Sequence, residues 1–262
     1  VSYYFEVYDN DGANGAKAAR TATFVYAQPS VKEIEKEIAK NNDEIRDDLK
    51  KALAESEKVQ QDLQKLRERM LQQKDVDWQM KKEAERLRMQ QQNVEKQMQQ
   101  AQKNFEENRK NETELNKTMD EQAQEKVAQI QEMFEQLKEN SELSNLLKQI
   151  EELLQKMDKD QALEKLEDSQ FSNEEMQKEL ERMQEMLKQL EVENAIQDQI
   201  DKLEELAKKE EDLAKDTEGG QKPQEELEKK QEELQKQLED LQKKEKETQE
   251  KNEELKRPKQ MP

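Results

Sequence analysis

One loop near the start of the chain carries oxygen ligands of the kind that bind Ca²⁺. Residues 9–15 (Asp-Asn-Asp-Gly-Ala-Asn-Gly) bring together Asp9, Asp11 and Asn14. A calcium loop of the EF-hand type needs Gly at its sixth position and Glu at its twelfth. Here Gly12 is fourth and Arg20 is twelfth. The favoured interpretation is therefore an acidic hairpin loop without a metal ion.

Other residue types that could take part in chemistry lack the surroundings that this chemistry requires. Residues 219–222 (Gly-Gly-Gln-Lys) resemble a phosphate loop only faintly, because the Walker pattern and its preceding strand are missing, so they are interpreted as a linker. Carboxylates are abundant, but acid–base pairs need pKa values separated by burial. The chain has no His and no Cys, which excludes imidazole catalysis, thiolate nucleophiles, disulfides and the usual zinc sites. The sequence predicts no catalytic, cofactor-binding or metal-ligating residue and no small-molecule substrate; the chain is expected not to be an enzyme.

Composition limits the fold that could position any site. Only 31% of the 262 residues are apolar and 42% are charged, too little apolar surface for a thick globular core. The net charge of −19 disfavours nucleic acid and anionic membranes as partners. No apolar run approaches the ~20 residues that span a bilayer. Since Val1 lies inside an expected strand, we expect the chain to be part of a longer protein.

The first 28 residues differ from all that follow. Residues 1–8 and 21–26 are rich in β-branched and aromatic residues, as strands are, and turn formers lie between them. The pattern predicts a β-hairpin over 1–28. Because two strands alone are marginal in water, we expect the hairpin to complete a β-sandwich that lies upstream.

A long helix is predicted over residues 30–105. Residues 30–33 (Ser-Val-Lys-Glu) form a capping box, and neither Gly nor Pro occurs from Ser30 to Glu218. Two tracks with a seven-residue period predict a coiled-coil seam. The first track is Ile38, Ile45, Ala52, Val59, Leu66, Gln73, Met80, Leu87, Val94 and Ala101. The second is Asn42, Leu49, Ser56, Leu63, Met70, Asp77, Ala84, Gln91, Met98 and Phe105.

Returning helices with short breaks are predicted over residues 112–218. The asparagines of 104–116 predict a turn, and further breaks are expected at 139–141, 158–160 and 168–172. Residues 172–175 (Ser-Asn-Glu-Glu) read as a second capping box that opens a new helix. Such breaks favour antiparallel helical hairpins, although a parallel dimer of the 31–105 helix remains open.

The C-terminal part is predicted as the linker 219–222 and a solvated helix over 223–256. Acid-before-base pairs four residues apart support this helix, for example Glu225 with Lys229. Residues 257–258 (Arg-Pro) are expected to end it. The predicted fold class is thus mainly α, an extended coiled coil or antiparallel helical hairpins, with an N-terminal β-hairpin left from a β-sandwich.

Several seam residues have two interpretations. Methionines at 70, 80, 98 and 183 are expected to pack in the core, the alternative being a Met-rich binding face. Trp78 is expected to pack against a neighbouring helix or to cap an interface. The polar seam positions Asn42, Ser56, Asp77 and Gln91 either fix the register or occupy a loose, hydrated seam.

Parts of the chain resemble a known family. The carriers are residues 4–15 at the β-to-coil junction, the Gln-rich helix that follows, residues 157–161 (Met-Asp-Lys-Asp-Gln), and the stretches 171–182 and 187–191. Together they resemble the large, membrane-anchored coiled-coil proteins of the Bacteroidetes, a domain-of-unknown-function family. The resemblance implies membrane helices upstream, outside this chain, and a place in the cell envelope, attached to the inner membrane. It implies no catalytic residue.

These observations favour a non-enzymatic segment that acts as an elongated spacer or scaffold arm. Its expected partners are a protein, or a second copy, bound through the heptad seams. One alternative is a holdase-like chaperone with Met-rich helical tentacles. Another is the coiled-coil arm of an ATPase whose nucleotide domain lies elsewhere.

Overall fold

The computed structural model describes residues 1–9, 17–25, 27, 29–115, 119–139, 142–219 and 223–259. Within these ranges the chain is mainly helical, with short strands only near its N-terminus. The strands are β1 (Ser2–Tyr3), β2 (Glu6–Tyr8), β3 (Ala18–Arg20) and β4 (Phe24–Val25). The helices are α1 (Val31–Gln72), α2 (Trp78–Glu114), α3 (Glu121–Glu139), α4 (Glu142–Gln155), α5 (Lys159–Gly219) and α6 (Gln224–Glu253).

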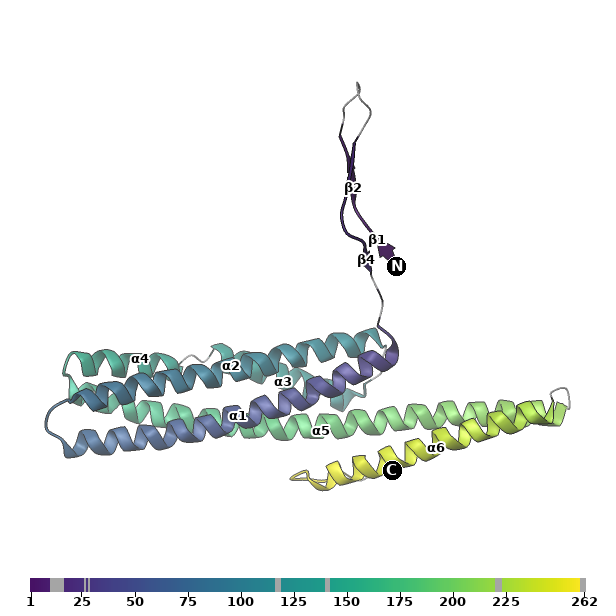
Figure 1. Ribbon diagram of the computed structural model, residues 1–262. Coiled ribbons are helices and arrows are strands. Elements are labelled where there is room, and N and C mark those ends of the chain that lie inside the picture. Colours follow the sequence, from purple (N-terminus) through teal and green to yellow (C-terminus); the bar gives the residue numbers. More distant parts are fainter. Residues whose placement is uncertain are drawn as a thin grey trace.

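The predicted β-hairpin is confirmed and stands away from the helices (Figure 1). β1 pairs with β4 and β2 pairs with β3, both antiparallel. Between the two ladders the backbone amide of Phe5 donates to Oγ1 of Thr21 at 3.1 Å. The loop residues 10–16, with most of the declined calcium site, lie outside the described residues. Asp9 is described, and its carboxylate accepts a hydrogen bond from the Lys17 amide at 2.8 Å.

Helix α1 begins at the predicted capping box. The Glu33 amide donates to Ser30 Oγ at 3.3 Å, and the Ser30 amide donates to Glu33 Oε2 at 2.8 Å. Hydrogen bonds from Ser30 lower the pKa of the Glu33 carboxyl. The amides of the N-cap residue and of the third helical residue thus have side-chain partners within one turn.

A single helix over residues 30–105 was the expectation, and it is wrong. α1 ends at Gln72 and α2 begins at Trp78, antiparallel to it. At Gln73 and Asp77 both heptad tracks are polar in succession, so a continuous helix would have no apolar contact to make there. Asp77 instead caps α2, accepting from the Met80 amide at 2.8 Å. The prediction that Asp77 is a seam residue is therefore wrong as well.

The body of the molecule is a bundle with helices at four positions. α3 and α4 follow one another along α2 and together occupy one position against α2 and α5, across the bundle from α1 (Figure 1). The core comprises two clusters, one joining α1, α2, α3 and α5 and one joining α1, α2, α4 and α5. Every apolar member of the two heptad tracks is buried. Antiparallel helical hairpins are thus the arrangement observed.

Two of the predicted breaks between the returning helices are confirmed. α3 ends at Glu139 and α4 begins at Glu142, while residues 140–141 lie outside the described residues. Between α4 and α5 the chain turns at Met157, whose φ of 65° is a left-handed conformation that a non-glycine residue rarely adopts. Asp158 then accepts a hydrogen bond from the Gln161 amide at 3.2 Å, which caps the start of α5.

The turn predicted from the asparagines of 104–116 comes later than most of them, because α2 runs through Asn104 and Asn108 to Glu114 before α3 begins at Glu121. The predicted break at 168–172 is wrong, because α5 runs without a break through residues 168–175. Ser172 is therefore an interior residue of α5 and not an N-cap. The physical reason is that polar side chains in both stretches form hydrogen bonds with α1.

α5 and α6 form a two-helix arm that projects beyond the body (Figure 1). α6 starts directly after Pro223 and packs antiparallel on the C-terminal half of α5. Most of α6 is exposed, as predicted for a solvated helix, and its buried residues are Leu241, Thr248 and Asn252. α6 ends at Glu253, before residues 257–258, where a stop was predicted.

Candidate functional site

Polar residues join α1 to α5 in what we call the Ser56 layer, which consists of the buried Ser56 and Asn173 and the partly exposed Gln60 and Gln177. Ser56 and Asn173 are both 0% exposed, and Ser56 Oγ donates to Asn173 Oδ1 at 2.8 Å. Nδ2 of Asn173 donates to the Ser56 carbonyl at 3.0 Å and to Gln60 Oε1 at 2.9 Å. The Gln177 side chain donates to the same carbonyl at 3.0 Å. Because the partners match only when the helices are in this register, the layer fixes how α1 and α5 align.

A second polar contact joins α1 to α2 near the other end of the body. Nδ2 of Asn108 donates to Asn42 Oδ1 at 2.6 Å and to the Ile38 carbonyl at 3.3 Å. Asn104 donates to Glu44 Oε2 at 3.0 Å. Asn104 and Asn108, two of the asparagines that predicted a turn, are thus interior helix residues whose side chains find partners on α1. Of the two interpretations of Asn42 and Ser56, these contacts favour the one in which they set the register.

The remaining seam residues have different surroundings. Met70, Met80, Met98 and Met183 are buried in the core, as expected. Gln91 is 3% exposed, and its amide contacts Met176 Sδ at 3.8 Å. Trp78, in contrast, is 69% exposed, with Lys82 Nζ 5.0 Å from the ring centroid. The expectation that Trp78 packs against a neighbouring helix is wrong, because it occupies the first, solvent-facing turn of α2.

Two carboxylates of α5 are held by cations in the body. Glu191 Oε2 lies 2.6 Å from Nη2 of Arg46 on α1, and burial raises the pKa of the Glu191 carboxyl against the opposing effect of Arg46. Glu193 is buried, and its Oε1 contacts Nζ of both Lys126 and Lys259. These ion pairs tie α5 to α1, to α3 and to the C-terminal tail. Within the described ranges no group of three or more Asp or Glu side chains has the geometry to hold a metal ion.

The C-terminal tail (residues 254–259) folds back onto the body. Asn252 brackets Lys259, donating to its carbonyl and accepting from its amide, both at 2.8 Å. The Lys256 amide donates to Glu185 Oε1 at 2.8 Å, and Leu255 is 4% exposed. Burial, followed by the charge of Lys126, lowers the pKa of the Lys259 ammonium. The tail therefore fastens the end of α6 to α5 and α3.

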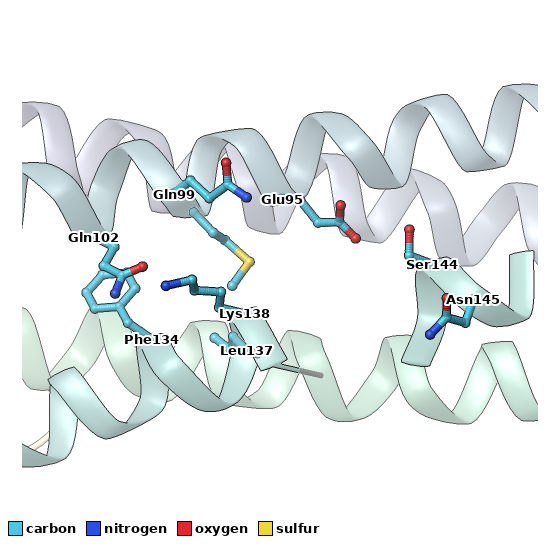
Figure 2. A pocket seen from close by; sticks show the side chains of 9 residues that line it. Glu95, Gln99, Gln102, Phe134, Leu137, Lys138, Ser144 and Asn145 are labelled. Carbon is cyan, nitrogen blue, oxygen red and sulfur yellow. The ribbon is translucent and has the colours of Figure 1, made fainter. Parts of the chain in front are cut away.

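A small hollow lies where α3 ends beside α2, shown in Figure 2. Its volume is about 170 Å³, and Met98, Phe134 and Leu137 supply its apolar part. Gln99, Gln102 and Lys138 contribute polar side chains to it. The Gln102 amide is already engaged with Glu135 Oε1 at 2.6 Å. The hollow is small, and none of its side chains converges on a common point (Figure 2), so it has no feature of a reaction centre.

A larger groove, here called the α1–α5 groove, has a volume of about 570 Å³. It is lined by Asn42, Ile45, Arg46, Leu49, Lys50 and Leu53 of α1, Gln184, Leu187, Lys188 and Glu191 of α5, and Lys251 and Glu254 at the end of α6. Leu53 and Leu187 are only partly buried. Sequence reasoning missed this surface. The available signal was Leu53, an apolar residue that belongs to neither heptad track.

The β-hairpin exposes a second apolar surface. The rings of Tyr3, Phe5 and Phe24 form one cluster, with centroid separations of 5.5 Å for Tyr3–Phe24 and 5.9 Å for Tyr3–Phe5. The side chains are 45%, 64% and 46% exposed, respectively. The hairpin therefore presents an exposed aromatic surface.

Comparisons of the chain with protein-family models, with curated proteins and with solved structures find no match. None of the described helices combines the length and the apolar content that crossing a lipid bilayer requires.

Proposed function

We propose that the chain is a non-enzymatic scaffold arm, a coiled-coil spacer that holds partners at a fixed distance. The observation that carries the proposal is the Ser56 layer, because a buried, fully paired Ser56–Asn173 contact defines one alignment of two long helices. A spacer needs a defined length more than it needs a reactive group. α5 alone has 61 residues, which corresponds to about 90 Å at 1.5 Å per residue.

The burial of the apolar stripes favours the arm over the holdase. A holdase must offer hydrophobic surface to unfolded clients, whereas Met70, Met80 and Met183 are 0% exposed. The two apolar clusters of the body use these side chains to hold the helices to one another. The purified chain is therefore expected not to suppress aggregation of an unfolding client protein, and clear suppression would favour the holdase.

Small-angle scattering tests the arm directly. A compact globule of this length has a radius of gyration of about 18 Å, whereas a rod about 90 Å long has one of about 26 Å or more. We expect the larger value, with a maximum dimension above about 90 Å. A radius near that of the compact globule would refute the proposal.

We further propose that the arm works in the cell envelope, in a protein attached to the inner membrane by segments outside this chain. The support is the resemblance of residues 4–15, 157–161, 171–182 and 187–191 to the membrane-anchored coiled-coil family. Fractionation of cells that produce the full-length protein tests this placement. Recovery of the full-length protein in the soluble cytoplasmic fraction would refute it.

A further inference from the structure

The α1–α5 groove is shaped by helix faces and not by loops. The α1 side chains at positions 42, 45, 46, 49, 50 and 53 recur every three and four residues, so they form one face over three turns. Positions 184, 187, 188 and 191 of α5 do the same over two turns. The α1 wall of the groove is therefore about 17 Å long and the α5 wall about 10 Å long, given a rise of 1.5 Å per residue. These are the dimensions of a seat for a short helix.

The floor of the groove is the edge of the core. Leu53 and Leu187 pack against the buried cluster that contains Ile45 and Leu49, yet both remain only partly covered. α6 covers the neighbouring part of α5, since Gln199 donates to Thr248 at 2.7 Å, but α6 ends where the groove begins. The apolar floor is thus left open in the described structure, beside a helix that already packs on α5.

The charge of the rim is opposite to that of the chain as a whole. The chain carries a net charge of −19, whereas four cations (Arg46, Lys50, Lys188 and Lys251) and two carboxylates (Glu191 and Glu254) line the groove. Arg46 is paired with Glu191 at 2.6 Å. Lys50 and Lys188, on opposite walls, form no ion pair with any described residue. A partner with carboxylates along both edges would supply the missing counter-charges.

We propose that the α1–α5 groove binds an acidic amphipathic helix of a partner protein. The apolar side chains of the partner, spaced three and four residues apart, lie on Leu53 and Leu187. Its Glu and Asp side chains, on either side of that stripe, pair with Lys50 and Lys188. A basic helix is disfavoured by the same lysines, so charge selects the partner while the leucines hold it. The proposal adds a partner surface to the scaffold arm and does not depend on the length of the arm.

The test uses the full chain and two synthetic peptides of about 14 residues, a length that matches three to four helical turns. Both peptides carry Leu at the same positions with a fluorescent label; one has Glu and the other has Lys on the flanks of the stripe. Fluorescence anisotropy at low ionic strength measures both affinities. We expect the acidic peptide to bind at least about tenfold more tightly, with an affinity that falls as salt is added.

Variants then locate the binding. The double variant Lys50→Glu/Lys188→Glu is expected to lose the acidic peptide by at least about tenfold and to gain affinity for the basic one. Lys96→Glu/Lys103→Glu, on the exposed face of α2, makes the same change in charge away from the groove and is expected to leave both affinities unchanged. Leu187→Gln is expected to weaken both peptides, because it acts on the floor. Circular dichroism of each variant checks that the helices remain folded.

Three results would overturn the proposal. The first is equal affinity for the two peptides, or no binding of either. The second is an acidic peptide whose affinity falls equally in the groove variant and in the α2 control. The third is self-association of the wild-type chain, in sedimentation velocity, that the groove variant abolishes, because a second copy would then be the occupant.

Discussion

Ser56 in α1 and Asn173 in α5 are 117 positions apart in sequence, yet their side chains, both 0% exposed, share a hydrogen bond of 2.8 Å. The same asparagine donates to the Ser56 carbonyl. A buried amide without partners costs more than a hydrogen bond contributes when it forms. This pair therefore restricts the alignment of the two helices more strongly than the apolar contacts around it.

Replacing Asn173 tests that restriction. Asn173→Ala removes the partners of Ser56 and Gln60 within a closed layer, so we expect the free energy of unfolding to fall by about 1–3 kcal/mol. Urea denaturation followed by circular dichroism measures the change. Asn93→Ala, at an exposed position of α2, is the matched control and is expected to change stability by less than about 0.5 kcal/mol. Equal losses in the two variants would show that the layer does not contribute.

The turn between α1 and α2 is tested at its cap. Asp77→Ala leaves the Met80 amide without its acceptor, and we expect a loss of about 1 kcal/mol in the free energy of unfolding. Asp75→Ala, at an exposed position of the same turn, is the control. If Asp77→Ala were as stable as wild type, the cap would not form and a continuous helix would again be the better description.

Glu191 makes stability depend on pH in an unusual direction for a carboxylate. Burial raises its pKa above the reference value of 4.5, so the folded state binds the proton more tightly than the unfolded state does. The contribution of Glu191 to the free energy of unfolding is fully present below pH 4.5. It is lost as the pH rises through the higher pKa of the folded state. We expect Glu191→Gln to remove this decline, measured by urea denaturation at a series of pH values that rises from 4.5.

Glu57→Gln is the control for that measurement, because Glu57 is exposed on α1. Its difference from wild type in unfolding free energy is expected to stay constant across the same pH series. A Glu191→Gln variant with the pH profile of wild type would contradict the assignment of the decline to Glu191.

The C-terminal tail is tested through Glu193. Glu193→Gln leaves Lys126 and Lys259 facing each other without their shared carboxylate, so we expect the tail to detach. Amide hydrogen exchange in residues 241–253 is expected to accelerate, while exchange in residues 59–70 of the core stays slow. Glu204→Gln on the exposed part of α5 is the control. Unchanged exchange in residues 241–253 would show that the contacts of Glu193 do not hold α6 in place.

The apolar pattern predicted most of the fold because burial follows it directly. Every apolar residue of the two tracks, from Ile38 to Phe105, is buried, and the strands and capping box are where their residue types indicated. The failures involve residues with two physical roles. Asn and Ser favour helix ends by local preference. Asn108 and Asn173 nevertheless lie inside helices, because their side chains form hydrogen bonds with residues of α1. Asp77 shows the converse, since a seam position became a cap once the chain turned.

Surfaces were harder to predict than the core. Lys50 and Lys188 are separated by more than a hundred positions, and only the packing of α5 against α1 brings them to one groove. Nothing in the local sequence around either lysine distinguishes it from the other exposed lysines of the chain. Their significance depends on tertiary alignment, which the Ser56 layer sets and which periodicity alone leaves undetermined.

α5 belongs to the body through its first half and to the projecting arm through its second half. Between Lys159 and Glu218 its sequence holds neither Gly nor Pro, the residues at which helices most readily kink. The arm is therefore a rigid projection and not a flexible connection. A sideways force at its tip acts on one continuous helix, which transmits the force directly to the packed core.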